Sequence, residues 1–398
     1  MTTEAFAPAT PAAPLTKAQA LRSYDVADFP ALTGQEEEWR FTPLKRLRPL
    51  LDAAPTPVGQ VVTQVSAPDG VTAEWVKRDD PRLGQVLVPF DRLSAQAWGG
   101  FDTALVVTVP RGATLTDLVT IEVRGQGDGV AYQHVLLDVQ PLAEATVVLD
   151  QAGSATLADN VEVAVAEGAR LTLVTVADWA RDAIQAQHLK LRLGRDATVT
   201  HVQVTLGGDL VRQYTSVAYT DRGGEAELYG LYFADAGQHL EHRQLVDHSV
   251  PDCRSYVGYR GALQGTGAHT VWVGDVLIRA AATGTDTYEI NRNLVLTDGA
   301  RADSVPNLEI ETGEVAGAGH ASATGRFDDE QLFYLMARGI PEDEARRLVV
   351  RGFFAELLNK IPVEELRDRL GAQIETRLAN TALATPAGED VAARAGAR

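Results

Sequence analysis

The 398-residue chain contains a single cysteine, Cys253. One thiol excludes an internal disulfide, a four-thiolate zinc site and an iron–sulfur site built from this chain alone. Positive charge is also scarce, because 36 Lys and Arg residues face 54 Asp and Glu residues and leave a formal net charge of −18. Such a surface repels nucleic-acid phosphates and anionic lipid headgroups, so we expect no nucleic-acid and no membrane partner.

Several catalytic motifs are missing from the sequence. None of the five lysines follows a glycine, which excludes the Gly-Lys pair of a phosphate-binding P-loop, and neither Gly-x-Ser-x-Gly nor His-Glu-x-x-His occurs. No apolar run is long enough to cross a bilayer. Residues 1–14 are rich in Ala, Pro and Thr and lack the basic start of a secretory signal. They predict a disordered leader on a cytoplasmic protein.

The remaining sequence changes in texture along its length. Residues 15–85 mix helical and irregular patterns, with leucines from Leu44 to Leu51 at helical spacing. Residues 86–325 alternate apolar and polar side chains, as in Val161, Val163 and Val165, which predicts strands with one buried face. Residues 326–380 predict three helices, divided at Gly339 and Pro362, and residues 381–398 predict a flexible tail.

A weak repeat runs through the β region. A short turn with a small residue restarts a strand at five alanines spaced by 24 to 32 residues, namely Ala113, Ala145, Ala169, Ala197 and Ala226. Recurrence at this period in a region with few helical patterns predicts stacked coils, that is, a β-solenoid. The spacing is irregular, so a large barrel and a double sandwich stay open as alternatives.

Histidine and cysteine provide few candidate sites. His239, His242 and His248 are close in sequence, but residues three apart on a strand face opposite sides, which argues against a local metal site. Cys253 lacks a histidine placed to activate it, so we expect an inert thiol. His320 differs, because small residues surround it where the β region meets the helices. A neutral imidazole there can bind a metal ion or relay a proton, and a structural role is the competing interpretation.

Several motifs taken together are similar to the SufB/SufD family, whose members build iron–sulfur clusters. The matching segments are Glu38 to Thr42, Asp252 to Ser255, Asn291 to Leu294, Ala300 to Asp303, Pro306 to Ile310, Gly319 to Ala321, Gly325 to Leu335 and Arg338 to Ile340. The resemblance implies a right-handed parallel β-helix core flanked by N-terminal and C-terminal helical regions. Length and the single cysteine resemble the SufD branch of the family more than the SufB branch.

The resemblance also implies partners and a site. A SufD-like chain pairs with a SufB-like subunit, and each binds one SufC-like ATPase, so this chain is expected to be a non-enzymatic subunit. His320 matches a histidine that contributes to transient binding of iron or a growing cluster at the SufB–SufD interface. Ala318 stands where many relatives have a cysteine. The resemblance places the SufC contact in the C-terminal helices, for which we single out Phe333, Tyr334, Arg338, Gly339, Ile340 and Pro341.

An interaction scaffold with no metal role is one alternative, and two further functions also stay open at this point. One is a SufB-like scaffold that assembles a cluster as a homodimer. The other is a β-helix lyase or hydrolase acting on acidic sugars. Asp275, Arg279, Asp286 and Arg292 are candidates for its groove, although surface salt bridges are the favoured interpretation of these four residues. The negative net charge argues against the second, because it repels a polyanionic substrate.

Overall fold

A computed structural model describes residues 21–52, 59–326 and 329–382 of the chain. The predicted leader at residues 1–14 and nearly all of the predicted tail at residues 381–398 lie outside the described residues. The elements in chain order are η2 (Val26–Asp28), η3 (Glu37–Trp39), α1 (Leu44–Leu51), β1 (Val61–Ser66), β2 (Thr72–Lys77), α2 (Arg92–Gly100), β3 (Thr103–Val109), β4 (Val119–Val139), β5 (Glu144–Val165), β6 (Arg170–Trp179), β7 (Ile184–Leu193), β8 (Thr198–Thr205), β9 (Leu210–Tyr219), β10 (Glu225–Ala234), β11 (His239–His248), β12 (Arg254–Leu263), β13 (His269–Ile278), β14 (Asp286–Val295), β15 (Arg301–Ile310), β16 (Gly317–Arg326), α3 (Asp329–Met336), α4 (Glu342–Leu358) and α5 (Glu364–Ala382).

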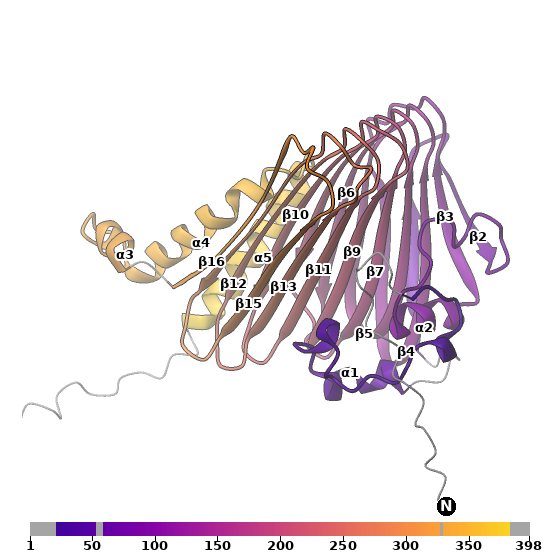
Figure 1. Cartoon of the computed structure of the whole chain (residues 1–398). Helices are drawn as coiled ribbons and strands as arrows, with labels where there is room; N and C mark the ends of the chain where they lie inside the picture. The colour runs from indigo at the N-terminus through magenta and orange to yellow at the C-terminus, as the bar shows by residue number, and fades with distance from the viewer. Residues whose placement is uncertain (1–20, 53–58, 327–328, 383–398) are drawn as a thin grey trace, which may run out of the picture.

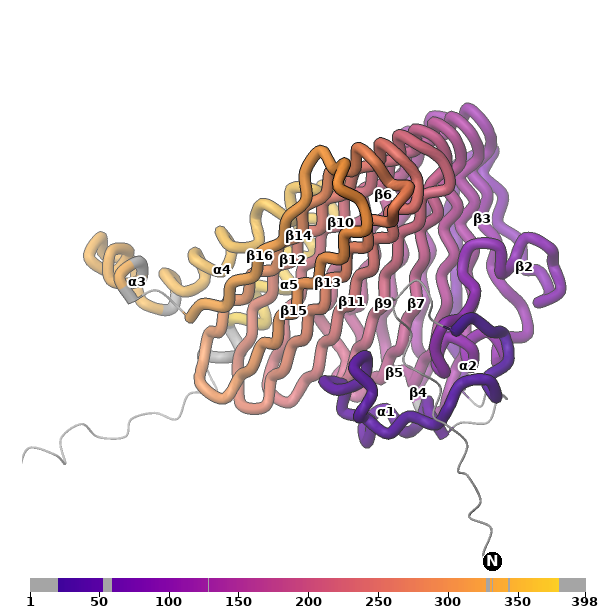
Figure 2. The backbone as a smooth tube through the Cα atoms, viewed as in Figure 1, coloured from indigo at the N-terminus to yellow at the C-terminus, as the bar shows by residue number. Residues whose placement is uncertain are grey.

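The strands wind into a parallel β-solenoid of about eight turns, as the repeat predicted (Figures 1 and 2). Strands β7, β9, β11, β13 and β15 form one wall, and β6, β8, β10, β12, β14 and β16 form the other. The long strand β5 joins them, because its first half pairs with β6 and its second half pairs with β7. Each coil therefore contributes one strand to each wall.

The alanine repeat corresponds to one corner of the coil. The register aligns Glu144, Arg170, Thr198, Glu225 and Arg254 at the starts of successive strands. The residue before each of them is small and buried, and these residues are Ala143, Ala169, Ala197, Gly224 and Cys253. Ala145 and Ala226 lie two positions further on, which explains the irregular spacing seen in the sequence. The single cysteine thus occupies an alanine position of the repeat.

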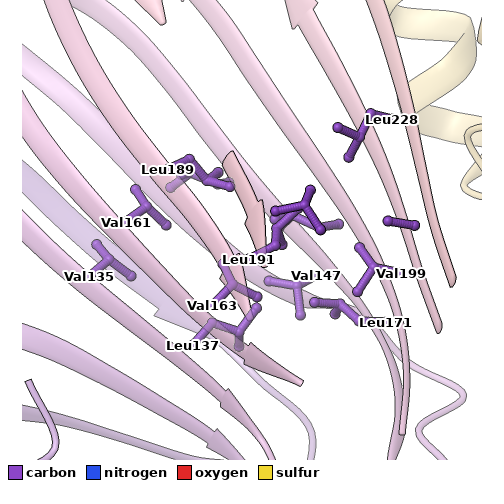
Figure 3. Packing of buried hydrophobic residues seen from close by; sticks show 14 of the residues in the cluster. Val135, Leu137, Val147, Val161, Val163, Leu171, Leu189, Leu191, Val199 and Leu228 are labelled. Carbon is purple, nitrogen blue, oxygen red and sulfur yellow. The ribbon is translucent and has the colours of Figure 1, made fainter. Parts of the chain in front are cut away.

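Apolar side chains fill much of the solenoid interior. Figure 3 shows part of this core, in which valine and leucine from both walls meet. Farther along, Tyr259 and Tyr232 fit inside because their partners in the register are glycines, Gly230 and Gly261. A Cβ atom added to Gly261 would lie 1.9 Å from the Tyr232 ring, so only glycine permits this stacking.

Helices cover the outer faces of the two walls. Val350, Phe354 and Leu357 of α4 pack with residues of α5 on the wall that contains β6, β8 and β10. Helices α1 and α2 cover the opposite wall, and Leu47 and Leu50 of α1 are fully buried there, as their helical spacing predicted. The strands begin at Val61, so the N-terminal mixed region also contributes β1 and β2 to the sheet.

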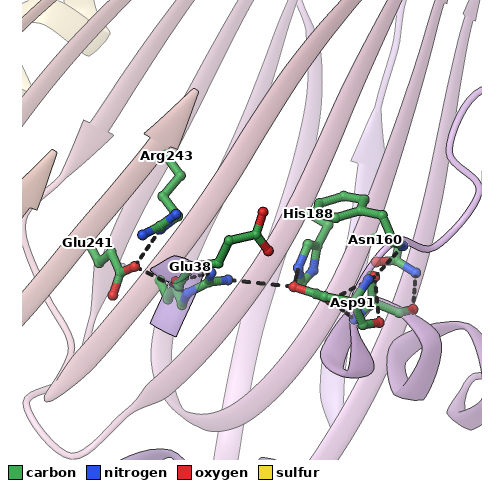
Figure 4. A network of polar contacts seen from close by, with 9 residues as sticks. Glu38, Asp91, Asn160, His188, Glu241 and Arg243 are labelled. Carbon is green, nitrogen blue, oxygen red and sulfur yellow. Dashed lines mark hydrogen bonds and ion pairs between the residues drawn. The ribbon is translucent and has the colours of Figure 1, made fainter. Parts of the chain in front are cut away.

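Buried ion pairs attach the N-terminal segment to its wall (Figure 4). Arg212 of β9 lies over the Trp39 ring at 3.8 Å and 3.3 Å from Glu241 of β11. Asp91, which caps α2, accepts a hydrogen bond from His188 of β7 at 3.0 Å. Burial alone would raise the pKa of Asp91, but His188 and Arg212 hold this pKa below its usual value. The Asp91 carboxylate therefore stays ionised although it is buried, because charged partners surround it.

The glycine–tyrosine stacking leads to a direct test. We expect Gly261→Ala to lower the free energy of unfolding by about 1–3 kcal/mol, because the new methyl group overpacks the interior against Tyr232. Gly313 is a matched control: its added Cβ would meet nothing within 4 Å, so Gly313→Ala should change stability by less than about 0.5 kcal/mol. Denaturant unfolding measures both, and equal effects of the two variants would contradict the stacking account.

Candidate functional site at the open end of the solenoid

The edge strands differ between the two ends of the solenoid. At the first end, β1 and β2 add short antiparallel strands to β4 and β3 and so cover the sheet edges. The strands β1 and β2 are edges themselves, but each has only six residues. At the other end the ten-residue strands β15 and β16 each pair on one side alone within the described part of the chain. Exposed strand edges carry backbone groups that can pair with another strand. The edges of both walls, and the side chains of the last coil that face inward, are therefore accessible to a partner at this end.

His320 lies on this open end. It is in the middle of β16 and opposite Glu289 of β14 in the parallel register, so both side chains face the solenoid interior. Glu289 is 1% exposed, whereas His320 is 42% exposed because no further coil covers it in the described structure. Its Nδ1 atom is 3.8 Å from Glu289 Oε1. Ala318 lies two residues before His320 on the same face.

Close packing beneath His320 fixes the Glu289 carboxylate. A Cβ atom on Gly274 of β13 would lie 2.4 Å from Glu289 Oε2 and equally close to the Trp272 ring. Glycine at this position thus allows the carboxylate and the indole to occupy the interior together. The result is an imidazole at the surface with a buried carboxylate behind it.

Asparagines of the Asn291-Arg292-Asn293 motif support the same coil. Asn291 donates a hydrogen bond to the Tyr232 hydroxyl at 2.9 Å, and that hydroxyl donates to Asn293 Oδ1 at 2.7 Å. Asn293 in turn donates to Asn291 at 2.7 Å and to Thr324 of β16 at 3.4 Å. This buried cycle links β10 and β14, and the bond to Thr324 adds to the backbone pairing that holds β16 on β14.

A comparison with known families identifies the family of this chain. Residues 121–353, from the first coil to α4, match the family model described as "SUF system FeS cluster assembly, SufBD core domain". The chain belongs to the SufBD family of iron–sulfur cluster assembly proteins. The matched region includes β15 and β16 of the last coil.

Individual relatives give the same result. An iron–sulfur cluster assembly SufBD family protein of Mycobacterium bovis is 58% identical over 369 residues, which cover 91% of this chain and 93% of the relative. One from Mycobacterium leprae is 55% identical over 374 residues, covering 92% and 95%. A second SufBD family protein of M. bovis is 28% identical over 218 residues, which cover 54% of this chain but 26% of that longer protein.

The three histidines close in sequence do not form a metal site. His239 faces outward from β11, whereas His242 and His248 point into the solenoid, as the strand period predicted. Burial lowers the pKa of His242 to about 3, so its ring is neutral, and it stacks on Tyr232. Throughout residues 21–52, 59–326 and 329–382, no three His, Cys, Asp or Glu side chains are grouped to hold a metal ion.

Cys253 is buried at its corner of the coil, as expected for an inert thiol. Burial raises the pKa of the thiol, and its Sγ lies 3.5 Å from the Pro251 carbonyl oxygen. A raised pKa keeps the sulfur protonated and weakly nucleophilic.

Among the helices of the described residues, none is both long and apolar enough to cross a membrane.

The four residues proposed for a saccharide groove lie apart. Asp275 and Arg279 belong to the wall with β13, where Arg279 forms a salt bridge with Asp247 at 2.6 Å. Asp286 and Arg292 lie on β14, in the opposite wall, and face outward. The groove hypothesis is therefore wrong, because the solenoid separates the two pairs.

The residues proposed for the ATPase contact lie on α3 and in the turn between α3 and α4, where several of their side chains are exposed. Phe333 and Tyr334 of α3 are 73% and 54% exposed, and Arg338 lies over the Tyr334 ring at 4.2 Å. Gly339 has a positive φ of 86° and ends the helix, and Pro341 caps the start of α4. Ile340 lies between these two residues.

Sequence reasoning missed Glu289 as the neighbour of His320. The stretch Asp286 to Val295 has polar residues on both faces: Asp286 and Arg292 face outward, whereas Thr287, Glu289, Asn291 and Asn293 face inward. Because both faces carry polar residues, the pattern does not show which face is buried. The pairing of Glu289 with His320 depends instead on the register between coils.

Proposed function

We propose that this chain is the SufD-like, cysteine-poor subunit of an iron–sulfur cluster assembly complex, paired through its open end with a SufB-like subunit. The observation that carries the proposal is the pair of free strand edges on β15 and β16, within the described structure, flanking an exposed inward-facing histidine. A second solenoid of the same family offers matching strands and can continue both walls. In that arrangement His320 lies at the junction.

Two different SufBD family proteins in one organism support a heterodimer. M. bovis has one relative that matches nearly all of this chain at 58% identity and another, longer one that matches about half of it at 28%. This chain is proposed to take the place of the first and to pair with a counterpart of the second. The alternative is a SufB-like homodimer of this chain. Coexpression with a SufB-like subunit distinguishes the heterodimer from this homodimer.

His320 is proposed to bind the cargo, an iron ion or the growing cluster, transiently. A neutral imidazole is a good ligand for iron, and Glu289 behind it can accept a proton or orient the ring. The chain offers no thiolate here, since Ala318 stands on the same face and Cys253 is buried elsewhere. Cysteine ligands must therefore come from the partner, and this subunit itself performs no catalysis.

The histidine proposal predicts a specific loss. In a complex coexpressed with the SufB-like and SufC-like subunits, we expect His320→Ala to lower bound iron and acid-labile sulfide by at least about tenfold, because even outer-shell partners of a ligand contribute about that much to metal affinity. Ser322→Ala, two residues along the same strand, should leave both unchanged. Unchanged cluster content in His320→Ala would remove the ligand role, and a stable cluster on this chain alone would favour the homodimer.

The ATPase partner is proposed to bind the exposed end formed by α3 and its turn. Phe333 and Tyr334 are large aromatic side chains left exposed beside Arg338, and aromatic and arginine residues dominate interface energetics. Such a partner would supply the nucleotide chemistry, for which this chain lacks a P-loop. Helix α4 then connects the contact to the solenoid wall.

This contact predicts a loss of binding without a loss of fold. We expect the double variant Phe333→Ser and Tyr334→Ser to weaken binding to the SufC-like ATPase by at least about thirtyfold, the effect of losing one contact worth about 2 kcal/mol. Trp75→Ser on β2 removes another exposed aromatic at the far end of the solenoid and should have no effect. Equilibrium binding of the purified proteins measures this, and wild-type affinity in the double variant would place the contact elsewhere.

A further inference from the structure

A pair of histidines on the outer wall has no part in the proposed function. His239 begins β11 and His269 begins β13, and the parallel register places them directly opposite each other. Their Nδ1 atoms are 3.1 Å apart, and their ring centroids are 4.8 Å apart. The two residues are one coil apart in the sequence, so the stacking of coils creates the pair.

Each ring also contacts a carboxylate through its other nitrogen. His239 Nε2 lies 3.2 Å from Glu241 Oε2, and His269 Nε2 lies 2.7 Å from Asp303 Oδ2.

This arrangement determines which ring nitrogens carry protons. A carboxylate oxygen lies within hydrogen-bond distance of each Nε2 and there accepts a hydrogen bond from an Nε2–H group. In the neutral rings both Nδ1 atoms then carry lone pairs, and the lone pairs face each other across 3.1 Å. Two facing lone pairs repel, and a cation between them removes the repulsion.

We propose that His239 and His269 form a binding site for a divalent first-row transition metal ion such as Zn²⁺, coordinated by the two Nδ1 atoms. Tetrahedral zinc with Zn–N bonds of about 2.0–2.1 Å separates two nitrogens by about 3.3 Å, close to the distance observed. A histidine ligand that donates its second N–H to a carboxylate is the usual outer-shell arrangement of such sites. Imidazole favours zinc, copper, iron and nickel over magnesium and calcium.

The surroundings allow an ion to reach the pair. The His269 and Asp303 side chains are 23% and 19% exposed, whereas His239 is buried, so the ion enters from the His269 side. The nearby cations are already paired, Arg301 with Asp303 and Arg243 with Glu241, each at 2.8 Å. With two protein ligands, water completes the coordination, and the bound ion is exchangeable.

The site is connected to the N-terminal segment. The Glu241 carboxylate that supports His239 also accepts a hydrogen bond from Thr42 at 2.7 Å. Figure 4 shows Glu241 within the network that attaches this segment to the wall. A metal ion on the histidine pair would therefore stabilise the same contact surface that holds η3 and α1.

Zinc titration of the full chain against a chromophoric chelator tests the proposal. We expect one Zn²⁺ per chain at this site and at least a tenfold weaker affinity in His269→Ala. Zinc bound through His320 would survive in that variant, so the two histidine sites are distinguishable. Absence of binding to the wild-type chain, or unchanged affinity in His269→Ala, would overturn the proposal.

A second variant keeps the test independent of the stability of His269→Ala. Asp303→Asn spares both ligands and alters the carboxylate behind His269, so it should weaken zinc binding by about 10–100-fold. Glu309→Gln, on an exposed residue of the same strand, should leave the affinity unchanged. Equal zinc affinities in Asp303→Asn and Glu309→Gln would also overturn the proposal.

Discussion

Backbone pairing between successive coils is the constraint on which this structure depends. In a parallel solenoid each strand satisfies its N–H and C=O groups with the coil before and the coil after it, so the first and last coils must be covered or left reactive. Short antiparallel strands cover the first coil. Those two strands are edges of six residues each, whereas within the described residues β15 and β16 are parallel edge strands of ten residues each. The two ends of the solenoid therefore differ.

Packing on the outer faces also differs between the early coils and the last coil. Helices α1 and α2 cover one wall in the early and middle coils, and α4 packs on β10 and β12 of the other. The last coil has mostly exposed or half-buried side chains on both strands. His320 is therefore held by the backbone pairing of β16 with β14 and lies exposed at the open end.

The sequence predicted the solenoid and the three C-terminal helices, because each depends on a local pattern, whereas the role of His320 stays a prediction. Alanines at a coil corner, leucines at helical spacing and Gly339 before Pro341 are readable without knowing which strands touch. Glu289 behind His320 and the pairing of His239 with His269 were not predictable in this way. Both depend on the register between coils, and coil length varies: Ala143, Ala169 and Ala197 are 26 and 28 residues apart, whereas His239 and His269 are 30 apart.

Hydrogen exchange on this chain, free and in complex with a SufB-like subunit, tests the open-end account most directly. Unpaired edge strands exchange quickly, and pairing with a second solenoid protects their amides. The account predicts that protection on complex formation concentrates in Arg301–Ile310 and Gly317–Arg326, with β1 and β2 unchanged. Protection at β1 and β2, with the exchange of β15 and β16 unaltered, would contradict it.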